Sequence, residues 1–178
     1  MAQNAAEIET VLPSLSTEST KVFCEDLDGM LGIALSSSQS AVGVGASKDL
    51  ESEFSALTAV YSVQSKGVLQ GSFYLLLDKP GLFLLSGLIV MLPEDKIKEQ
   101  SRRGTLDEAQ KLIDSIREIG NLMIGSWDRV YREQMTGHEH FLQTDTKIFS
   151  AWKQAEESLG LAPEGTCLRV LWDITVPD

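Results

Sequence analysis

One long amphipathic segment limits the folds open to this chain more than any other feature. Thr105 and Glu108, in the sequence TLDE, form a capping box that predicts a helix start near Leu106. Gly137 is a natural end for the same helix. At about 1.5 Å per residue the helix would be roughly 45 Å long, which is unusual for a domain built from 178 residues.

This predicted helix has two very different faces. At about 100° per residue, one band is apolar and is expected to face the core: Leu112, Ile116, Ile119, Met123, Trp127 and Val130. A second band, about 60° wide and almost opposite, contains Asp114, Glu118, Asn121 and Gly125. We therefore predict that these polar side chains point away from the core.

The composition of the outer band is not that of an ordinary solvated helix. Asp114 and Glu118 lie four residues apart and repel each other slightly, so nothing local favours the pair. Gly120 and Gly125 each cost about 1 kcal/mol relative to alanine inside a helix. A glycine at position 125 leaves room beside Asn121 for another molecule to approach. The pattern indicates a docking surface that presents a carboxylate and a carboxamide.

A carboxylate next to a carboxamide suits one kind of chemistry. The carboxylate of Glu118 can anchor a cation on a partner through a charge-assisted hydrogen bond. The amide of Asn121 both donates and accepts, and it can hold a water molecule without repelling an anion. Together they fit the hydrolysis of a phosphoryl group carried by another protein, a reaction in which catalysis is mostly positioning and electrostatic stabilisation.

The rest of the chain is expected to form two similar halves, residues 16–92 and 105–178, joined by a charged linker, 93–104. Residues 1–15 have no basic segment followed by an apolar run, so we predict a disordered lead-in and not a secretory signal. A first helix is expected over Lys21–Leu35, with Phe23, Leu27, Met30 and Ala34 on one side.

The remaining segments have weaker signals. The apolar residues Val68–Leu92 are interpreted as two strands joined by a DKPG turn. Ser36–Ser47 is expected to be a loop or irregular strand, and Ser47 to be the N-cap of a short helix. Further along, HEHFLQT is expected to be extended, KIFSAWKQAEESLG helical with Gly160 at its end, and CLRVLWDITVPD a strand.

A short repeated pattern supports the division into two similar halves. Glu25, Asp28, Met30 and Gly32 have the same spacing as Glu118, Asn121, Met123 and Gly125. If the halves are repeats, the last strand of the second half lacks a partner, so we expect the natural chain to continue beyond residue 178.

Composition excludes several classes of function. A net charge of −11 and a pI near 4.6 argue against nucleic acid or an anionic membrane as partner, since both require a basic surface. Each apolar run is too short to cross about 30 Å of hydrocarbon. Cys24 and Cys167 show no CxxC spacing. His138 and His140 have no third ligand at a recognisable spacing, so no metal site is predicted. A cytoplasmic location is expected.

The outer band also carries a family resemblance. The spacing D-x-x-x-E-x-x-N in DSIREIGN, followed by LMIGS, resembles the active-site signature of the CheC/CheX/FliY phosphatases, which dephosphorylate the response regulator CheY in bacterial chemotaxis. The resemblance covers most of Lys21–Asp178, although only this helix carries a specific motif. It implies an α/β (α+β) domain with pseudo-twofold symmetry, in which two long helices pack on a mainly antiparallel sheet.

The resemblance also implies roles for the residues. Glu118 would pair with the lysine of the receiver active site, and Asn121 would orient a water in line with the aspartyl phosphate. Asp114 and Gly125 would support docking of the partner. The receiver would supply its own Mg²⁺, so no cofactor is expected on this chain.

Two departures from the family pattern define the alternatives. Thr144 stands where the pattern has a proline, 23 residues after the asparagine. In the first half, Lys21 and Asp28 replace the expected residues, and the carboxylate of Asp28 would repel phosphoryl oxygens. Glu25 and Asp28 are therefore predicted to form a degenerate, inactive second site. CheX-like members resemble a one-site arrangement and act as dimers, so a homodimer is compatible with the resemblance. The alternative function is a non-catalytic CheC-like scaffold in chemotaxis or in the flagellar switch.

Overall fold

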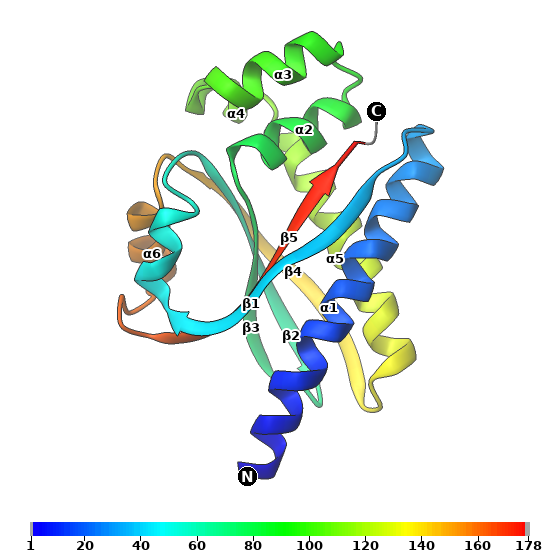
Figure 1. Cartoon of the computed structure of the whole chain (residues 1–178), viewed down its shortest axis with the longest axis vertical. Coiled ribbons are helices and arrows are strands. Elements are labelled where there is room, and N and C mark those ends of the chain that lie inside the picture. Colours follow the sequence, from blue (N-terminus) through cyan, green and yellow to red (C-terminus); the bar gives the residue numbers. More distant parts are fainter. Residues whose placement is uncertain (1, 177–178) are drawn as a thin grey trace.

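The computed structural model describes residues 2–176 of the chain, with side chains from Thr10 onward. Figure 1 shows helices and strands intermixed along the sequence. In chain order the elements are α1 (Ala2–Leu31), β1 (Ser36–Ala46), the 3₁₀ helix η1 (Ser47–Ser52), β2 (Thr58–Gly67), β3 (Gly71–Leu77), α2 (Lys79–Ile89), α3 (Glu94–Arg103), α4 (Leu106–Lys111), α5 (Ile113–Gln134), β4 (His138–Phe149), α6 (Trp152–Leu159) and β5 (Thr166–Thr175).

The strands form two antiparallel sheets whose pairing is reciprocal between the halves. One sheet has the order β1-β5 and the other β3-β2-β4. In each half a long helix is followed by a strand, a short helix and a second strand. The first strand of each half pairs with the second strand of the other, β1 with β5 and β4 with β2. This exchange is what a pseudo-twofold α/β domain requires, and the expected fold class is confirmed. Only β3, which adds to β2, has no counterpart among the described residues.

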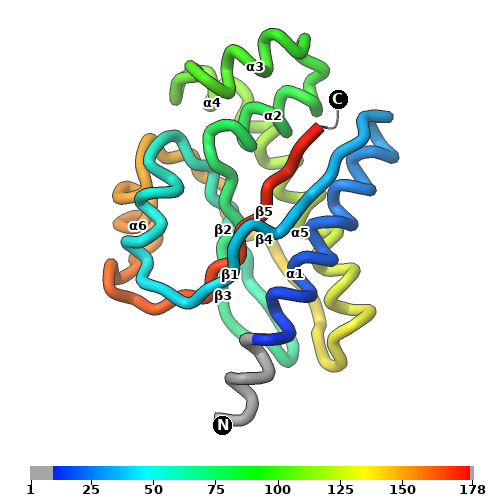
Figure 2. The backbone as a smooth tube through the Cα atoms, viewed as in Figure 1, coloured from blue at the N-terminus to red at the C-terminus, as the bar shows by residue number. Residues whose placement is uncertain are grey.

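Helices α1 and α5 lie side by side along one side of the strands, while η1 and α6 lie on the other (Figures 1 and 2). The core-facing band of α5 is as predicted: Ile116, Ile119, Met123, Trp127 and Val130 are buried, and Leu112 packs against the same cluster. The rings of Trp127 and Tyr131 stack, and the ring of Trp172 in β5 lies edge-on to Trp127, with 5.7 Å between the ring centroids. A second, smaller cluster surrounds Trp152. The core therefore fixes which face of α5 remains outside.

The hairpin predicted for Val68–Leu92 is wrong in its second half, which is helix α2. Asp78 is its N-cap, with a side-chain oxygen accepting a hydrogen bond from the Gly81 N–H at 2.8 Å. Pro80 lies in the first turn, where the missing N–H costs nothing. The helix is apolar on nearly all sides because it is largely buried, so no period distinguished it from a strand.

The N-terminal region also differs from its prediction. Residues assigned to a disordered lead-in belong to α1, which extends far upstream of Lys21. Leu15 and Ser19 are buried, and the Ser19 hydroxyl donates to the Leu15 carbonyl oxygen at 2.7 Å. Such back-bonding lets a Ser- and Thr-rich segment enter a helix interface without unpaired hydroxyls. At its other end α1 stops at Leu31, and Met30 is 55% exposed instead of packed.

The connection between the halves is helical. The predicted linker 93–104 contains α3, in which Ile97 is buried, Gln100 and Ser101 are half-buried and the other residues are exposed. The capping box that follows is confirmed, with the Thr105 N–H donating to Glu108 Oε2 at 2.8 Å and the Glu108 N–H to Thr105 Oγ1 at 3.3 Å. The single helix predicted from Leu106 is interrupted at Leu112, whose N–H bonds to the carbonyl of Ala109 three residues back. Two helices, α4 and α5, result.

The weaker predictions are mostly correct. HEHFLQT lies in β4, and KIFSAWKQAEESLG contains α6, but its first three residues, 147–149, are the end of β4 and not helical as predicted. Gly160 ends α6 with a left-handed φ of 66°. The C-terminal strand is β5, and the Ser/Gly-rich segment is the strand β1. Ser47 is the first residue of η1 instead of its cap. Among the described helices, none combines the length and the hydropathy needed to cross a membrane.

Candidate functional site

The predicted outer face of α5 is open to solvent. Asp114, Glu118, Asn121 and Gly125 are all exposed. The side chains of Glu118 and Asn121 make neither a hydrogen bond nor an ion pair with any described residue. The carboxylate and the carboxamide are therefore available to an external partner, one helical turn apart.

Asp114 has a local role that the sequence argument missed. Because the helix restarts after Leu112, Asp114 lies in the first turn of α5, where the helix dipole favours a negative charge. Its Oδ1 also lies 3.3 Å from Nη1 of Arg117. The expectation that nothing local favours Asp114 is wrong, because it assumed a helix running uninterrupted from Leu106.

The two glycines of the site serve different purposes. A Cβ atom at Gly120 would lie 2.4 Å from Cδ1 of Tyr61 and 2.6 Å from Oε1 of Gln143, so only glycine allows α5 to approach β2 and β4 this closely. At Gly125 a Cβ would meet nothing within 4 Å. The fold needs Gly120, whereas the space at Gly125 faces solvent.

A surface hollow of about 220 Å³ adjoins Asn121. It lies between α5 and β4, and its lining residues are Arg117, Asn121, Gln143, Thr144, Asp145 and Thr146. Thr144 has no partner in the β2–β4 register, since Ser62 pairs with Asp145 and Val63 with Gln143. Thr144 is thus the extra residue of a β-bulge, a strand position that tolerates proline. The departure from the family pattern lies directly at the site.

Charges at this hollow are balanced by surface ion pairs. Asp145 lies 3.0 Å from Nζ of Lys147, and that hydrogen bond, together with one from the Thr146 N–H and the nearby charge of Arg117, holds the pKa of Asp145 below its usual range. Asp145 is therefore ionised at neutral pH. The hollow presents a carboxylate, an amide and a guanidinium side by side.

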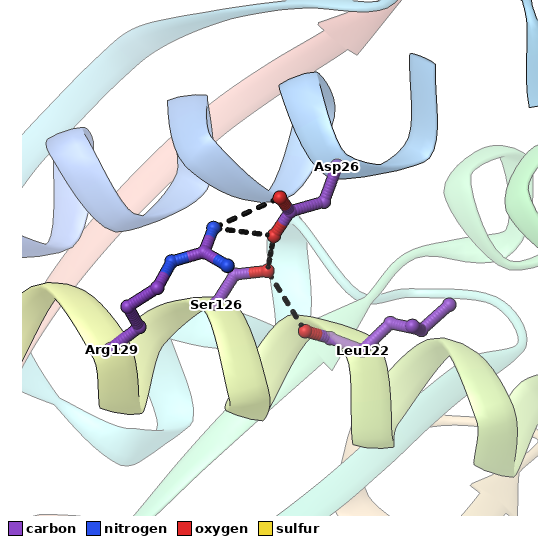
Figure 3. Close-up of polar contacts among 4 residues, drawn as sticks. All are labelled: Asp26, Leu122, Ser126 and Arg129. Atoms are coloured by element: carbon purple, nitrogen blue, oxygen red, sulfur yellow. Dashed lines mark hydrogen bonds and ion pairs between the residues drawn. The ribbon is translucent and has the colours of Figure 1, made fainter. Parts of the chain in front are cut away.

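A partly buried polar cluster links α5 to α1 (Figure 3). The Asp26 carboxylate accepts from Arg129 Nη2 at 2.8 and 2.9 Å and from the Ser126 hydroxyl at 2.6 Å. Partial burial alone would raise the pKa of Asp26, but the hydrogen bonds from Ser126 and Arg129 and the charge of Arg129 outweigh it and lower that pKa. The cluster ties the half that contains the site to the other half, one residue beyond Gly125.

His138 is packed into the structure by a hydrogen bond and aromatic contacts. The side chain of His138 is fully buried, and its Nε2 lies 3.0 Å from Asp128 Oδ1, which also accepts from the Phe141 N–H at 2.7 Å. His138 packs on the rings of Tyr131 and Phe141. Across the described residues, no group of three or more His, Cys, Asp or Glu side chains could hold a metal ion.

Glu25 and Asp28 are exposed on α1, and Lys21 Nζ lies 3.8 Å from Glu25. Their position is not equivalent to that of the α5 pair. Asn121 precedes His138, the first residue of β4, by 17 residues, whereas Asp28 precedes Ser36, the first residue of β1, by eight. The degenerate second site stays a prediction, for which the order of elements gives no support.

No family model matches the sequence, and no curated protein matches it. The arrangement of the chain is nevertheless the CheC-like fold that the α5 signature predicts, and it is found in solved structures of FliY and FliM.

Three solved structures illustrate the similarity. Thermotoga maritima FliY is 18% identical over 96% of this chain and 83% of its own, with a TM-score of 0.75. Helicobacter pylori FliM in a FliM–SpeE complex is 11% identical over 96% and 82%, with a TM-score of 0.70. The FliM middle domain of Vibrio alginolyticus is 13% identical over 91% and 83%, with a TM-score of 0.65. At these identities the similarity shows the fold alone.

Four lining residues of the hollow were not predicted: Arg117, Gln143, Asp145 and Thr146. Arg117 could have been found from the sequence, because it lies four residues before Asn121 on the same helix. Gln143 and Asp145 flank Thr144, the position that the family pattern singled out. No sequence signal shows that this part of β4 lies against Asn121, since the contact depends on the packing of the halves.

Proposed function

We propose that this protein is a phosphatase that hydrolyses the aspartyl phosphate of a CheY-like response-regulator receiver. One observation carries the proposal: Glu118 and Asn121 are exposed, lack internal partners and lie one turn apart beside a hollow. The D-x-x-x-E-x-x-N signature and the shared fold with FliY support it.

In the proposed mechanism the chain supplies positioning. Glu118 pairs with a lysine of the receiver and fixes the orientation of the complex. The Asn121 amide holds a water in line with the phosphorus atom, and being neutral it does not repel the phosphoryl oxygens. Mg²⁺ belongs to the receiver in this proposal, so the chain itself needs no metal.

The test is the decay of phosphate from candidate receivers loaded with a small-molecule phosphodonor. We expect wild type to accelerate decay, Asn121→Ala to lose most of the acceleration, and Glu118→Ala to lose both binding and rate. Glu133→Ala is the matched control, since it removes an exposed glutamate near the other end of the same helix. Wild type that binds receivers without accelerating decay would rule the phosphatase out.

A second candidate function is a non-catalytic scaffold in chemotaxis or in a flagellar switch. The shared fold with FliM favours it, since solved structures show H. pylori FliM in complexes with FliG and with SpeE. Thr144 in place of the family proline also fits this alternative. Receiver binding that is independent of phosphorylation, without turnover, is its expected signature.

A further inference from the structure

Arg117 has a distinctive place at the hollow. Among the residues that line it, Arg117 is the only basic one, in a chain with a net charge of −11. At about 100° per residue, Asn121 lies between Arg117 and Glu118 around the helix, about 40° from the first and about 60° from the second. The amide is therefore flanked by a cation on the β4 side and by an anion on the other side.

The guanidinium is held only loosely in the free protein. Its hydrogen bond to Asp114 Oδ1 is 3.3 Å long, and the side chains of Arg117 and Asp114 are 56% and 94% exposed. The charge of Arg117 helps to lower the pKa of Asp145, but that carboxylate is hydrogen-bonded to Lys147. Exposed pairs of this kind contribute little free energy, so Arg117 can exchange partners at small cost.

We infer that Arg117 binds the oxygens of the receiver's phosphoryl group while Asn121 orients the water. This inference rests on the proposed phosphatase function and adds a cation to its site. The planar guanidinium presents two parallel N–H donors, the geometry that suits a phosphoryl group. When no partner is bound, the guanidinium is paired only with the exposed carboxylate of Asp114.

The reaction is balanced without any further reactant. Water attacks phosphorus, its new P–O bond forms as the bond from phosphorus to the aspartyl oxygen breaks, and the products are the free carboxylate and dihydrogen phosphate. Negative charge on the equatorial oxygens must be stabilised throughout. The receiver's Mg²⁺ would act from the receiver's side, whereas on this chain's side the carboxylates of Asp114 and Asp145 would repel the phosphoryl oxygens unless a cation of the chain offset them. Arg117 is placed to supply that cation.

The test compares Arg117→Ala and Arg117→Lys with wild type in phosphate release from a phosphorylated receiver. Arg103→Ala is the matched control. Arg103 is exposed at the end of α3, and its substitution removes the same charge at a distance from the hollow. We expect Arg117→Ala to lower kcat/KM about tenfold or more, less than the 10²–10³ typical of a donor enclosed in an active site. Arg117→Lys should recover part of the loss, and Arg103→Ala should leave the rate unchanged.

A second measurement separates a phosphoryl contact from a general docking contact. Affinity is measured for the receiver alone and for the receiver carrying beryllofluoride as a phosphoryl mimic. Arg117→Ala should reduce affinity for the mimic-loaded receiver only. An equal loss for both forms, or a phosphatase rate within twofold of wild type, would overturn the role of Arg117 while leaving the phosphatase proposal intact. An inactive wild type would overturn both.

Discussion

Gly120 and Gly125 look alike in the sequence, but their surroundings in α5 are opposite. Gly120 is buried against the ring of Tyr61 and the amide of Gln143, and it makes the close approach of the helix to the strands possible. Gly125 faces open space. A helix-interior glycine costs about 1 kcal/mol relative to alanine, so one glycine is compensated by packing and the other is not.

Alanine substitutions should therefore move stability in opposite directions. We expect Gly120→Ala to destabilise the protein by about 1–3 kcal/mol, since the added methyl overlaps a buried ring and an amide oxygen. Gly125→Ala should stabilise it by up to about 1 kcal/mol through helix propensity. Urea unfolding of the two variants and wild type measures both changes.

The same pair of variants tests the docking role of Gly125. If a partner approaches α5 closely at this position, Gly125→Ala should weaken receiver binding even though the protein is more stable. A variant that is both more stable and unchanged in binding would show that Gly125 has no part in docking.

At the level of elements, α5 is fixed to α1 by the Asp26–Ser126–Arg129 cluster, and its contribution depends on pH. The pKa of Asp26 is lowered in the folded protein, so its stabilisation is present above the unfolded carboxyl pKa of about 3.9 and is lost as pH falls through the lower folded value.

We expect Asp26→Asn to reduce the free energy of unfolding by about 1 kcal/mol at neutral pH, a modest value because Asp26 is 35% and Arg129 52% exposed. Thermal unfolding at several pH values should show the wild type and the variant converging as pH falls below about 4. A difference that persists undiminished at pH 2 would exclude ionisation of Asp26 as its source.

Elements with a clear period or cap could be predicted from the sequence, whereas those defined by packing could not. The core band of α5, the Thr105 capping box and the C-terminal strand were correct because each depends on local spacing. Helix α2 was mistaken for a strand because a helix buried on nearly all sides has no polar face. In the N-terminal part of α1, Ser16, Ser19 and Thr20 are buried beside Leu15, so the apolar period there is incomplete.

The candidate site likewise has residues that the sequence predicts and residues that only the packing brings together. Glu118 and Asn121 followed from the helical repeat, since exposure on one face is set by the apolar band on the other. The part of the hollow on β4 joins residues that are 22 or more positions from Asn121 in sequence, at a bulge that no local pattern announces. Asp114 was misinterpreted because the break at Leu112 determines whether it lies inside a helix or at its start.

For the whole molecule, reciprocal strand pairing means that neither half has a complete sheet of its own. β1 depends on β5 and β4 depends on β2, while α1 and α5 share one core. Each half therefore leaves apolar surface that the other half covers, and we expect that a half alone cannot bury enough of it to offset the entropy of folding. The halves behave as one cooperative unit although their elements repeat.

Dividing the chain at the exposed α3 tests this dependence. Fragments 1–92 and 105–178, expressed separately, should show no cooperative thermal unfolding and little strand signal by circular dichroism. Mixing them in equal amounts should restore a folded complex with a concentration-dependent midpoint, since folding has become association. Cleavage at an inserted protease site within α3 of the intact protein is the control, because it separates the same two halves after folding. A fragment that unfolds cooperatively by itself would show that one half holds its own core and that the exchange of strands is not what stabilises the fold.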